Sequence, residues 1–186
     1  PLGICGSGIV DAIAGMLSAG IIDETGRIPG EDEIEDIPET YRERIVRIDG
    51  INSLLLVPAD ESAVGTDIAI TQKDIRELQN AKAAIAAGVK TLVKRAGIKL
   101  EDIDRVYLAG GFGNFINIDN ALKIGLIPKE LKGKIESIGN AAGAGAVEGL
   151  LSADMLKDAE IIKNRIKYIE LSAAPDFVDE YVENML

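Results

Sequence analysis

Histidine is absent from the 186-residue sequence, and cysteine occurs only once, at Cys5. Without histidine, no Ser-His-Asp or Cys-His arrangement can support nucleophilic catalysis. One cysteine allows no disulfide within the chain and no Cys/His zinc site. Any acid–base chemistry would therefore come from carboxylates, lysine or tyrosine. Cys5 lies among glycines and apolar residues, so we expect a small buried side chain, with a reactive thiol as the alternative.

Basic residues are few, because 20 Lys and Arg stand against 31 Asp and Glu, which gives a net charge of −11. Nucleic-acid binding needs a cationic surface to meet phosphates, and this balance argues against it. The negative charge is typical of a solvated surface or, alternatively, of one that attracts a basic partner. Residues 31–39, EDEIEDIPE, concentrate the charge around a proline and predict an exposed loop.

Long apolar runs are missing as well. No stretch approaches the roughly 20 apolar residues of a membrane span, and no secretory signal is recognisable, so we expect a cytoplasmic protein with no membrane partner. The length suits one domain over 1–186, with 23–65 as a loop and hairpin insertion within it. Because the sequence opens at Pro1 rather than Met, we expect a piece of a longer protein.

Helical and strand patterns alternate along the second half of the chain, which predicts an α/β layered domain. Asp49-Gly50 indicates a hairpin turn, and Thr71 with Asp74 fits a capping box at the start of a long helix whose apolar face would be Ile75, Leu78, Ile85, Val89 and Leu92. We expect helices over 8–19, 71–97, 117–126 (capped by Asn117 or Asp119), 140–152, 153–171 (running into a short strand) and 175–186, and strands within 43–60, 66–71, 104–111 (buried) and 134–139.

Two glycine-rich turns stand where ligands bind in α/β domains, at a strand's carboxyl end or a helix N-terminus. One is Gly110-Gly111, after the strand 104–111, and the other is Gly6-Ser7-Gly8. Glycines let a flat ligand or a phosphate approach the backbone, and a helix start supplies free N–H groups. The alternative is that a helix only crosses a strand closely. The sequence 111–116 lacks the third glycine of a dinucleotide motif, and no P-loop motif occurs.

The segment VYLAGGFGNF resembles the adenosine motif of the actin, sugar-kinase and 70-kilodalton chaperone superfamily. NAAGAGAVEGLL resembles the connecting helix that follows that motif, and RELQNAKAAIAAG (76–88) stands where chaperone members place a helix beside the adenine. A closer resemblance covers nearly the whole chain. PLGICGSGIVDAIAGMLSAGIID, ITQKDIRELQNAKAAIAAGVKTLVKRAGI, DRVYLAGGFGNFINIDNALKIGLIP, IGNAAGAGAVEGLLS and IKYIELSAAPDFVDEYVENML are similar to the carboxy-terminal region of the ATP-dependent reductive activators of corrinoid proteins.

This resemblance implies part of an actin-like (ribonuclease H-like) ATPase lobe, an α/β fold with a mixed sheet and flanking helices. Family members use ATP, with an iron–sulfur cluster in a separate domain, to return Co(II) corrinoid proteins to Co(I). The family's phosphate motifs and its cluster cysteines are absent from this sequence. The chain would therefore hold the adenosine side of the nucleotide cleft, and its expected partners are a corrinoid protein and the missing lobe of its own ATPase domain.

The resemblance also implies a set of ligand-binding residues. Mg²⁺ would accompany ATP or ADP, but it would be held by phosphates and by the missing half, so we assign no metal ligand and no catalytic residue. The alternative is core packing for Phe112 and Phe115, a solvated lysine for Lys82, and caps or surface carboxylates for Asp11, Asp67 and Asp74. The nucleotide-binding candidates are Gly110, Gly111, Phe112, Gly113, Gly6, Ser7, Gly8, Gln79 and Lys82.

Two other readings of function remain open. The chain could be a docking module for a corrinoid protein that binds no nucleotide. It could also be a lobe of a sugar or acid kinase, although no matching segment supplies that class's catalytic Asp. The close-packing spacings Gly139-x-x-x-Gly143 and Gly145-x-x-x-Gly149 indicate a helix pressed against a sheet or a partner lobe, and they favour a homodimer if that face is left uncovered.

Overall fold

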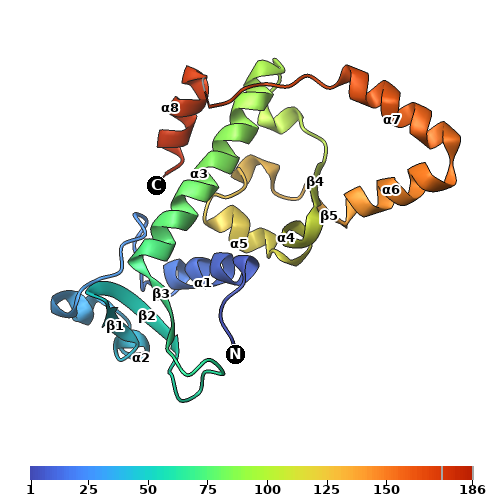
Figure 1. The fold of residues 1–186 in the computed structure, drawn as a ribbon. Coiled ribbons are helices and arrows are strands. Elements are labelled where there is room, and N and C mark those ends of the chain that lie inside the picture. The colour runs from blue at the N-terminus through green and yellow to red at the C-terminus, as the bar shows by residue number, and fades with distance from the viewer. Residues whose placement is uncertain (173, 186) are drawn as a thin grey trace.

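The computed structural model describes residues 1–172 and 174–185. Within these residues the strands form a three-stranded sheet in the order β1-β2-β3 and a two-stranded sheet, β4-β5 (Figure 1). The helices are α1 (Gly6–Ser18), α2 (Glu39–Arg42), α3 (Gln72–Arg95), α4 (Gly110–Phe115), α5 (Ile118–Lys123), α6 (Ala141–Leu151), α7 (Ala153–Arg165) and α8 (Pro175–Glu183), and the strands are β1 (Ile45–Ile48), β2 (Ile51–Val57), β3 (Ile68–Thr71), β4 (Val106–Ala109) and β5 (Ile135–Gly139).

The antiparallel sheet follows from local turn chemistry. Asp49 and Gly50 have φ values of 50° and 78°, which is the pair of left-handed residues that a tight hairpin between β1 and β2 requires. The predicted turn is confirmed. The acidic segment before it is not a simple loop, because a 3₁₀ helix covers Glu31–Asp36, α2 follows, and Ile37 between them is buried. Ile37, together with the partly buried Ile34, attaches this charged stretch to the core.

The long helix α3 begins at the predicted capping box. The N–H of Asp74 donates to Oγ1 of Thr71 over 3.2 Å, and the N–H of Thr71 donates to Oδ2 of Asp74 over 2.8 Å. Gly97, at φ 72°, follows the last turn as predicted. The predicted apolar face is partly wrong. Ile75 is buried, but Ile85 and Leu92 are nearly half exposed, and the inward face carries small residues and unexpected polar ones, namely Gln79, Lys82, Ala83, Ala86, Ala87, Gly88 and Thr91.

The parallel pair β4-β5 is less covered than expected. The predicted strand β4 forms. However, Tyr107 is 54% exposed, and partly buried and exposed residues alternate along β4, so the prediction of a buried strand is wrong for this chain. Among the described residues, β4 has β5 as its sheet neighbour on one side and no strand on the other. Asn117 caps α5 through Oδ1, which accepts the N–H of Asn120, as predicted.

Helices α6 and α7 contact each other and extend away from the body before the chain returns to α8, which lies along α3 (Figure 1). The expected strand after α7 does not form: residues 166–171 belong to no helix or strand. Asp176 accepts a hydrogen bond of 2.8 Å from Arg95, and Asn184 accepts one of 2.9 Å from Lys90. The predicted last helix ends at Glu183, and position 186, like 173, lies outside the described residues.

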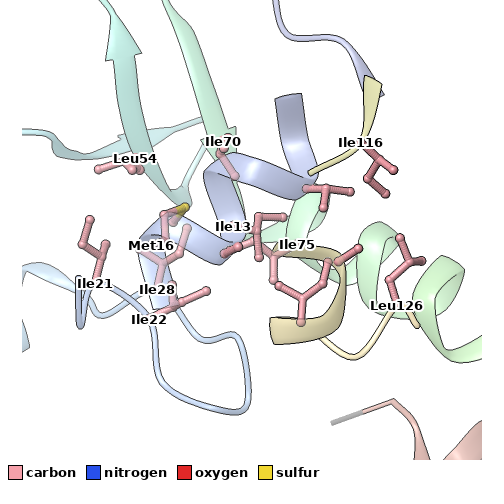
Figure 2. Close-up of a cluster of buried hydrophobic side chains, with 14 of the residues drawn as sticks. Ile13, Met16, Ile21, Ile22, Ile28, Leu54, Ile70, Ile75, Ile116 and Leu126 are labelled. Carbon is pink, nitrogen blue, oxygen red and sulfur yellow. The ribbon is translucent and has the colours of Figure 1, made fainter. Parts of the chain in front are cut away.

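One cluster of buried side chains joins the antiparallel sheet to α1, α3 and the region of α5. Figure 2 shows Ile13 and Met16 of α1 between Leu54 and Ile70 of the antiparallel sheet and Ile75 of α3. Ile116 and Leu126, which flank α5, belong to the same cluster. Helix α1 is thus packed between the antiparallel sheet and the elements around α5.

Candidate functional site

The two glycine-rich turns of the sequence lie next to each other in space. Gly6 opens α1, and Phe112 lies in α4 just after β4. A Cβ placed on Gly6 would be 3.4 Å from Cε2 of the Phe112 ring. The structure therefore brings together segments separated by about a hundred residues, and Gly6, Ser7, Gly8, Gly110, Gly111, Phe112 and Gly113 form one surface, which we call the glycine surface.

Glycine stands at the different positions of this surface for different physical reasons. Gly110 has φ 86°, a left-handed conformation in which a side chain is strained. A Cβ on Gly110 or Gly111 would meet nothing within 4 Å, apart from adjacent residues and the helix's own backbone, in the part of the chain described. On Gly113 it would be 3.1 Å from Cβ of Leu108. Close packing therefore accounts for Gly113 but not for Gly110 or Gly111, which leave open space.

The amino end of α1 adds a polar edge to the glycine surface. Its first turn carries no acidic side chain, so no carboxylate offsets the partial positive charge of the helix start. Cys5 is the N-cap and is exposed, contrary to our expectation of a buried thiol, because the chain before the helix leaves the body there. Its Sγ lies 3.3 Å from Oγ of Ser7, and this hydrogen bond, together with one from the Gly8 backbone, lowers the pKa of the Cys5 thiol.

The aromatic residues of α4 are at the surface. Phe112 is 49% exposed and Phe115 75%, so neither is the core aromatic that the alternative reading proposed. Phe112 instead presents part of its ring beside Gly6, where a flat ligand would find an apolar contact. Ser137 of β5 donates to the carbonyl of Gly113 over 3.2 Å and so fastens α4 to the neighbouring strand.

A third turn reaches the same sheet edge, and sequence reasoning did not assign it to the site. In the parallel pair, Ala109 lies opposite Gly139, so the carboxyl ends of β4 and β5 adjoin. Gly139 has φ 63°, and Asn140 caps α6 by accepting the N–H of Gly143 over 2.9 Å. The signal that could have found it is a glycine at the junction where a strand leads directly into a helix, as at Gly110 after β4.

Gln79 and Lys82 lie elsewhere. Both are 8% exposed and line a cavity between α1, α3, α5 and the segment 22–26, and none of the residues 6–8 or 110–113 lines that cavity. The alternative of a solvated lysine at position 82 is wrong, since the side chain is buried and burial lowers the pKa of that ammonium group. Asp74 is the helix cap described above, Asp11 accepts a hydrogen bond of 2.8 Å from Asn120, and Asp67 accepts one of 2.8 Å from the N–H of Ala59.

Comparison with known proteins identifies the family of this chain. The family model described as the C-terminal domain of RACo, the ASKHA domain, matches residues 1–186. The chain belongs to this family. Its fold is accordingly the actin-like ASKHA fold, here in part and with α/β composition, as the resemblance implied. In the solved structure of a reductive activator for corrinoid, iron–sulfur protein, the matching region superposes with a TM-score of 0.82 at 40% identity, over 98% of this chain and 28% of that one.

Two curated relatives of this RACo family member are named for corrinoid chemistry. The corrinoid activation enzyme RamQ of Eubacterium limosum is 41% identical over 188 residues, which is 100% of this chain and 31% of the relative. The [Co(II) methylated amine-specific corrinoid protein] reductase of Methanosarcina barkeri is 30% identical over 165 residues, or 89% of this chain and 25% of the relative. The chain thus spans less than a third of the length of each.

The glycine surface fits one of the expected cofactors and does not fit the other. Two open glycines beside a helix start leave room for the flat end of a nucleotide. An iron–sulfur cluster needs several cysteine ligands, and this sequence has only Cys5. Across residues 1–172 and 174–185, no three Asp, Glu or Cys side chains come together as a metal site, and no helix is long and apolar enough to cross a membrane.

Proposed function

We propose that this chain is the adenosine-side part of the ATP-binding domain of a reductive activator that returns Co(II) corrinoid proteins to Co(I). The observation that carries the proposal is the open pair Gly110-Gly111 beside the amino end of α1. The names of the relatives, which concern corrinoid activation and reduction, support the activity of the longer protein. When bound, ATP would supply the free energy for the uphill electron transfer.

The residues of the glycine surface have limited roles in this proposal. Gly110 and Gly111 let the purine and ribose lie against the backbone, and Phe112 offers an apolar contact for the ring system. The N–H groups at Gly6, Ser7 and Gly8, which have no acceptor within α1 itself, face the more negative part of the nucleotide. Mg²⁺, the phosphate-binding hairpins and the iron–sulfur cluster are assigned to other parts of the protein, because this chain offers no ligand set for them.

The exposed apolar side chains of α6 and α7 support a partner within the same polypeptide. Leu150 and Leu151 of α6 and Ile166, which directly follows α7, are each more than two-thirds exposed, although such side chains normally lie in a core. Because the relatives are more than three times as long as the matched region, we propose that the other lobe of the ATPase domain covers this face. A cytoplasmic location, where such an activator would meet a corrinoid protein, is part of the same proposal.

Calorimetric titration with ADP and with a non-hydrolysable ATP analogue tests the nucleotide site. We expect binding by the intact polypeptide that contains this chain and its loss in Gly111→Val, because the valine would occupy the space in which the purine lies. Gly15→Val is the matched control, since Gly15 is also exposed with open space around it, but on the middle of α1. Unchanged binding by Gly111→Val would contradict the site.

The docking-module alternative makes a different prediction. A chain that only docks a corrinoid protein would bind that protein equally with and without ADP, and no variant of the glycine surface would respond to nucleotide. Measuring the affinity for a corrinoid protein at saturating ADP and without it separates the two. The kinase alternative lost support when the relatives proved to be named for corrinoid chemistry.

A further inference from the structure

The turn between β1 and β2 combines an exposed location with backbone strain. It consists of Asp49 and Gly50. At φ 50°, Asp49 is the only residue other than glycine with a positive φ in the described part of the chain. A left-handed conformation is unfavourable for a residue that carries a Cβ. The folded turn therefore holds Asp49 in a conformation that it leaves readily when this end of the hairpin opens.

Side-chain packing holds this end of the hairpin only weakly. Residues 49–51 are exposed, and Ile48 is only partly buried. The nearest pair of facing residues that are both buried is Ile45 and Leu54, at the other end of β1. Segments with few buried contacts open locally at a much lower free energy than the whole domain unfolds. The turn can therefore open while the core stays folded.

The Asp-Gly sequence places a nucleophile next to a carboxyl group. A bond from the amide nitrogen of Gly50 to Cγ of Asp49 would close a five-membered ring, and glycine has no side chain to shield that nitrogen. Among the described residues, the N–H of Gly50 donates to no acceptor, and no hydrogen bond or ion pair engages the Asp49 carboxylate. Both groups are therefore available for reaction when the turn opens.

We propose that Asp49 is a modification site, at which a cyclic succinimide forms spontaneously and opens to isoaspartate. The Gly50 nitrogen bonds to Cγ of Asp49, and the hydrogen of that nitrogen leaves with the carboxyl OH as water. Water then adds to the ring. Cleavage of the bond between Cγ and nitrogen restores Asp49, whereas cleavage of the original peptide bond leaves Cγ in the main chain and a free α-carboxylate. One water is lost and one is gained, with no redox change, so isoaspartate has the mass of the parent.

The conversion lengthens the backbone of the turn by one carbon atom. A two-residue turn fixes the register of the strands that it joins, and Ile48 lies opposite Ile51 in that register. We expect the added atom to release this pair, while Ile45 and Leu54 keep the far end of β1 in the core. The modification involves no residue of the glycine surface, so it does not depend on the proposed function.

Peptide mapping of the intact folded polypeptide, stored for weeks at neutral pH, tests the proposal. A protease that cleaves before aspartate but not before isoaspartate releases 36–48 and 49–59 from the parent, and isoaspartate at position 49 gives the joined peptide 36–59. We expect the joined peptide to accumulate at a rate within about a hundredfold of that in a synthetic peptide of the same sequence, because local opening suffices. Cleavage before Asp60 and Asp67, which larger residues follow, should stay complete.

Asp49→Asn is the matched variant, because the same ring then forms with loss of ammonia instead of water. Residue 49 should gain the mass difference between an amide and an acid, whereas Asn52, whose amide donates to the Ile28 carbonyl over 3.2 Å, should keep its amide. Equal loss of cleavage before Asp60 overturns the proposal. A folded-state rate below the hundredfold limit, or no joined peptide, also overturns it, because the reaction would then require global unfolding, with an equilibrium constant of about 10³ or more.

Discussion

At the scale of single residues, Gly110 and Gly111 are neighbours at which substitution by alanine should affect the free energy of unfolding differently. Gly110 is held at φ 86°, where alanine is strained, while Gly111 has no left-handed φ, and open space surrounds both. Each residue can therefore serve as the control for the other.

We expect Gly110→Ala to lower the free energy of unfolding by about 1 kcal/mol, the usual cost of a left-handed alanine. Gly111→Ala should leave the free energy of unfolding unchanged or raise it by a few tenths of a kcal/mol, because alanine stabilises a helix and restricts the unfolded chain. Urea denaturation followed by circular dichroism measures both. An equal loss in the two variants would show that the space at Gly111 is filled in solution.

The candidate site also shows which residues a sequence can assign. The small residues at 6–8 and 110–113 were recognisable because a turn needs them locally, and the structure places these two segments together. Gln79 and Lys82 were chosen because the segment 76–88 resembles a helix that chaperone members place beside the adenine, but which way a helix faces depends on what packs against it. Their separate location follows from the loop at 23–27, whose hydrogen bonds to α3 no local pattern reveals.

At the scale of elements, the contact between α8 and α3 includes polar pairs near the surface. Arg95 pairs with Asp176 at 2.8 Å, and Lys90 lies 3.7 Å from Glu180. Hydrogen bonding to Arg95 lowers the pKa of the Asp176 carboxyl in the folded chain. The Asp176 carboxylate therefore favours the docked helix at any pH above its ordinary pKa, and this contribution is lost as the pH falls through the lowered value.

We expect docking of α8 to weaken when the pH falls below about 4 and when salt is added at neutral pH, since both remove the attraction between Arg95 and Asp176. Amide hydrogen exchange along α8 measures it. Asp176→Asn should give fast exchange in α8 already at neutral pH and without added salt. Glu160→Gln, which breaks an exposed pair within α7, is the control and should leave exchange in α8 unaltered. Protection that is insensitive to pH and salt would mean that apolar contacts hold the helix.

The elements that could be predicted are those set by nearby residues. The hairpin at Asp49-Gly50, the capping box at Thr71 and the cap at Asn117 were all found. Which side chains are buried could not be predicted in this way, because burial depends on residues far along the chain. In α3 the inward face is lined with alanines and Gly88, where Leu171 lies 3.6 Å from the position of a Cβ. Small residues at a close contact give a weak apolar signal, and the larger Ile85 and Leu92 were wrongly included in the buried face.

At the scale of the whole molecule, the uncovered face of α6 and α7 distinguishes this chain from a complete globular unit. Their side chains Val147, Leu150, Leu156 and Ile161 are each more than half exposed. Burying such side chains in a contact with another lobe would contribute roughly 1.5–3 kcal/mol each.

We expect Leu150→Ser to leave the stability of the isolated chain within about 0.5 kcal/mol of the parent, because the side chain is 85% exposed there. In the intact polypeptide the same change should cost roughly 2–3 kcal/mol, since a covered leucine would be lost. Val64→Ser, in an exposed loop, is the control for both. Sedimentation of the isolated chain checks the competing occupant: a dimer that Leu150→Ser converts to monomer would identify a second copy on this face instead of the other lobe.

The route of the chain through α6 and α7 has a mechanical consequence. These helices are attached at one end to β5, at Gly139, and at the other end, through residues 166–174, to α8 on α3. A segment with two fixed ends, or anchors, can tilt but cannot slide, so a lobe that packs on α6 and α7 would rotate about the line joining the anchors. One anchor adjoins the strand edge that carries Gly110. Displacement in such a rotation is smallest at the two anchors, and one of them lies beside the glycine surface.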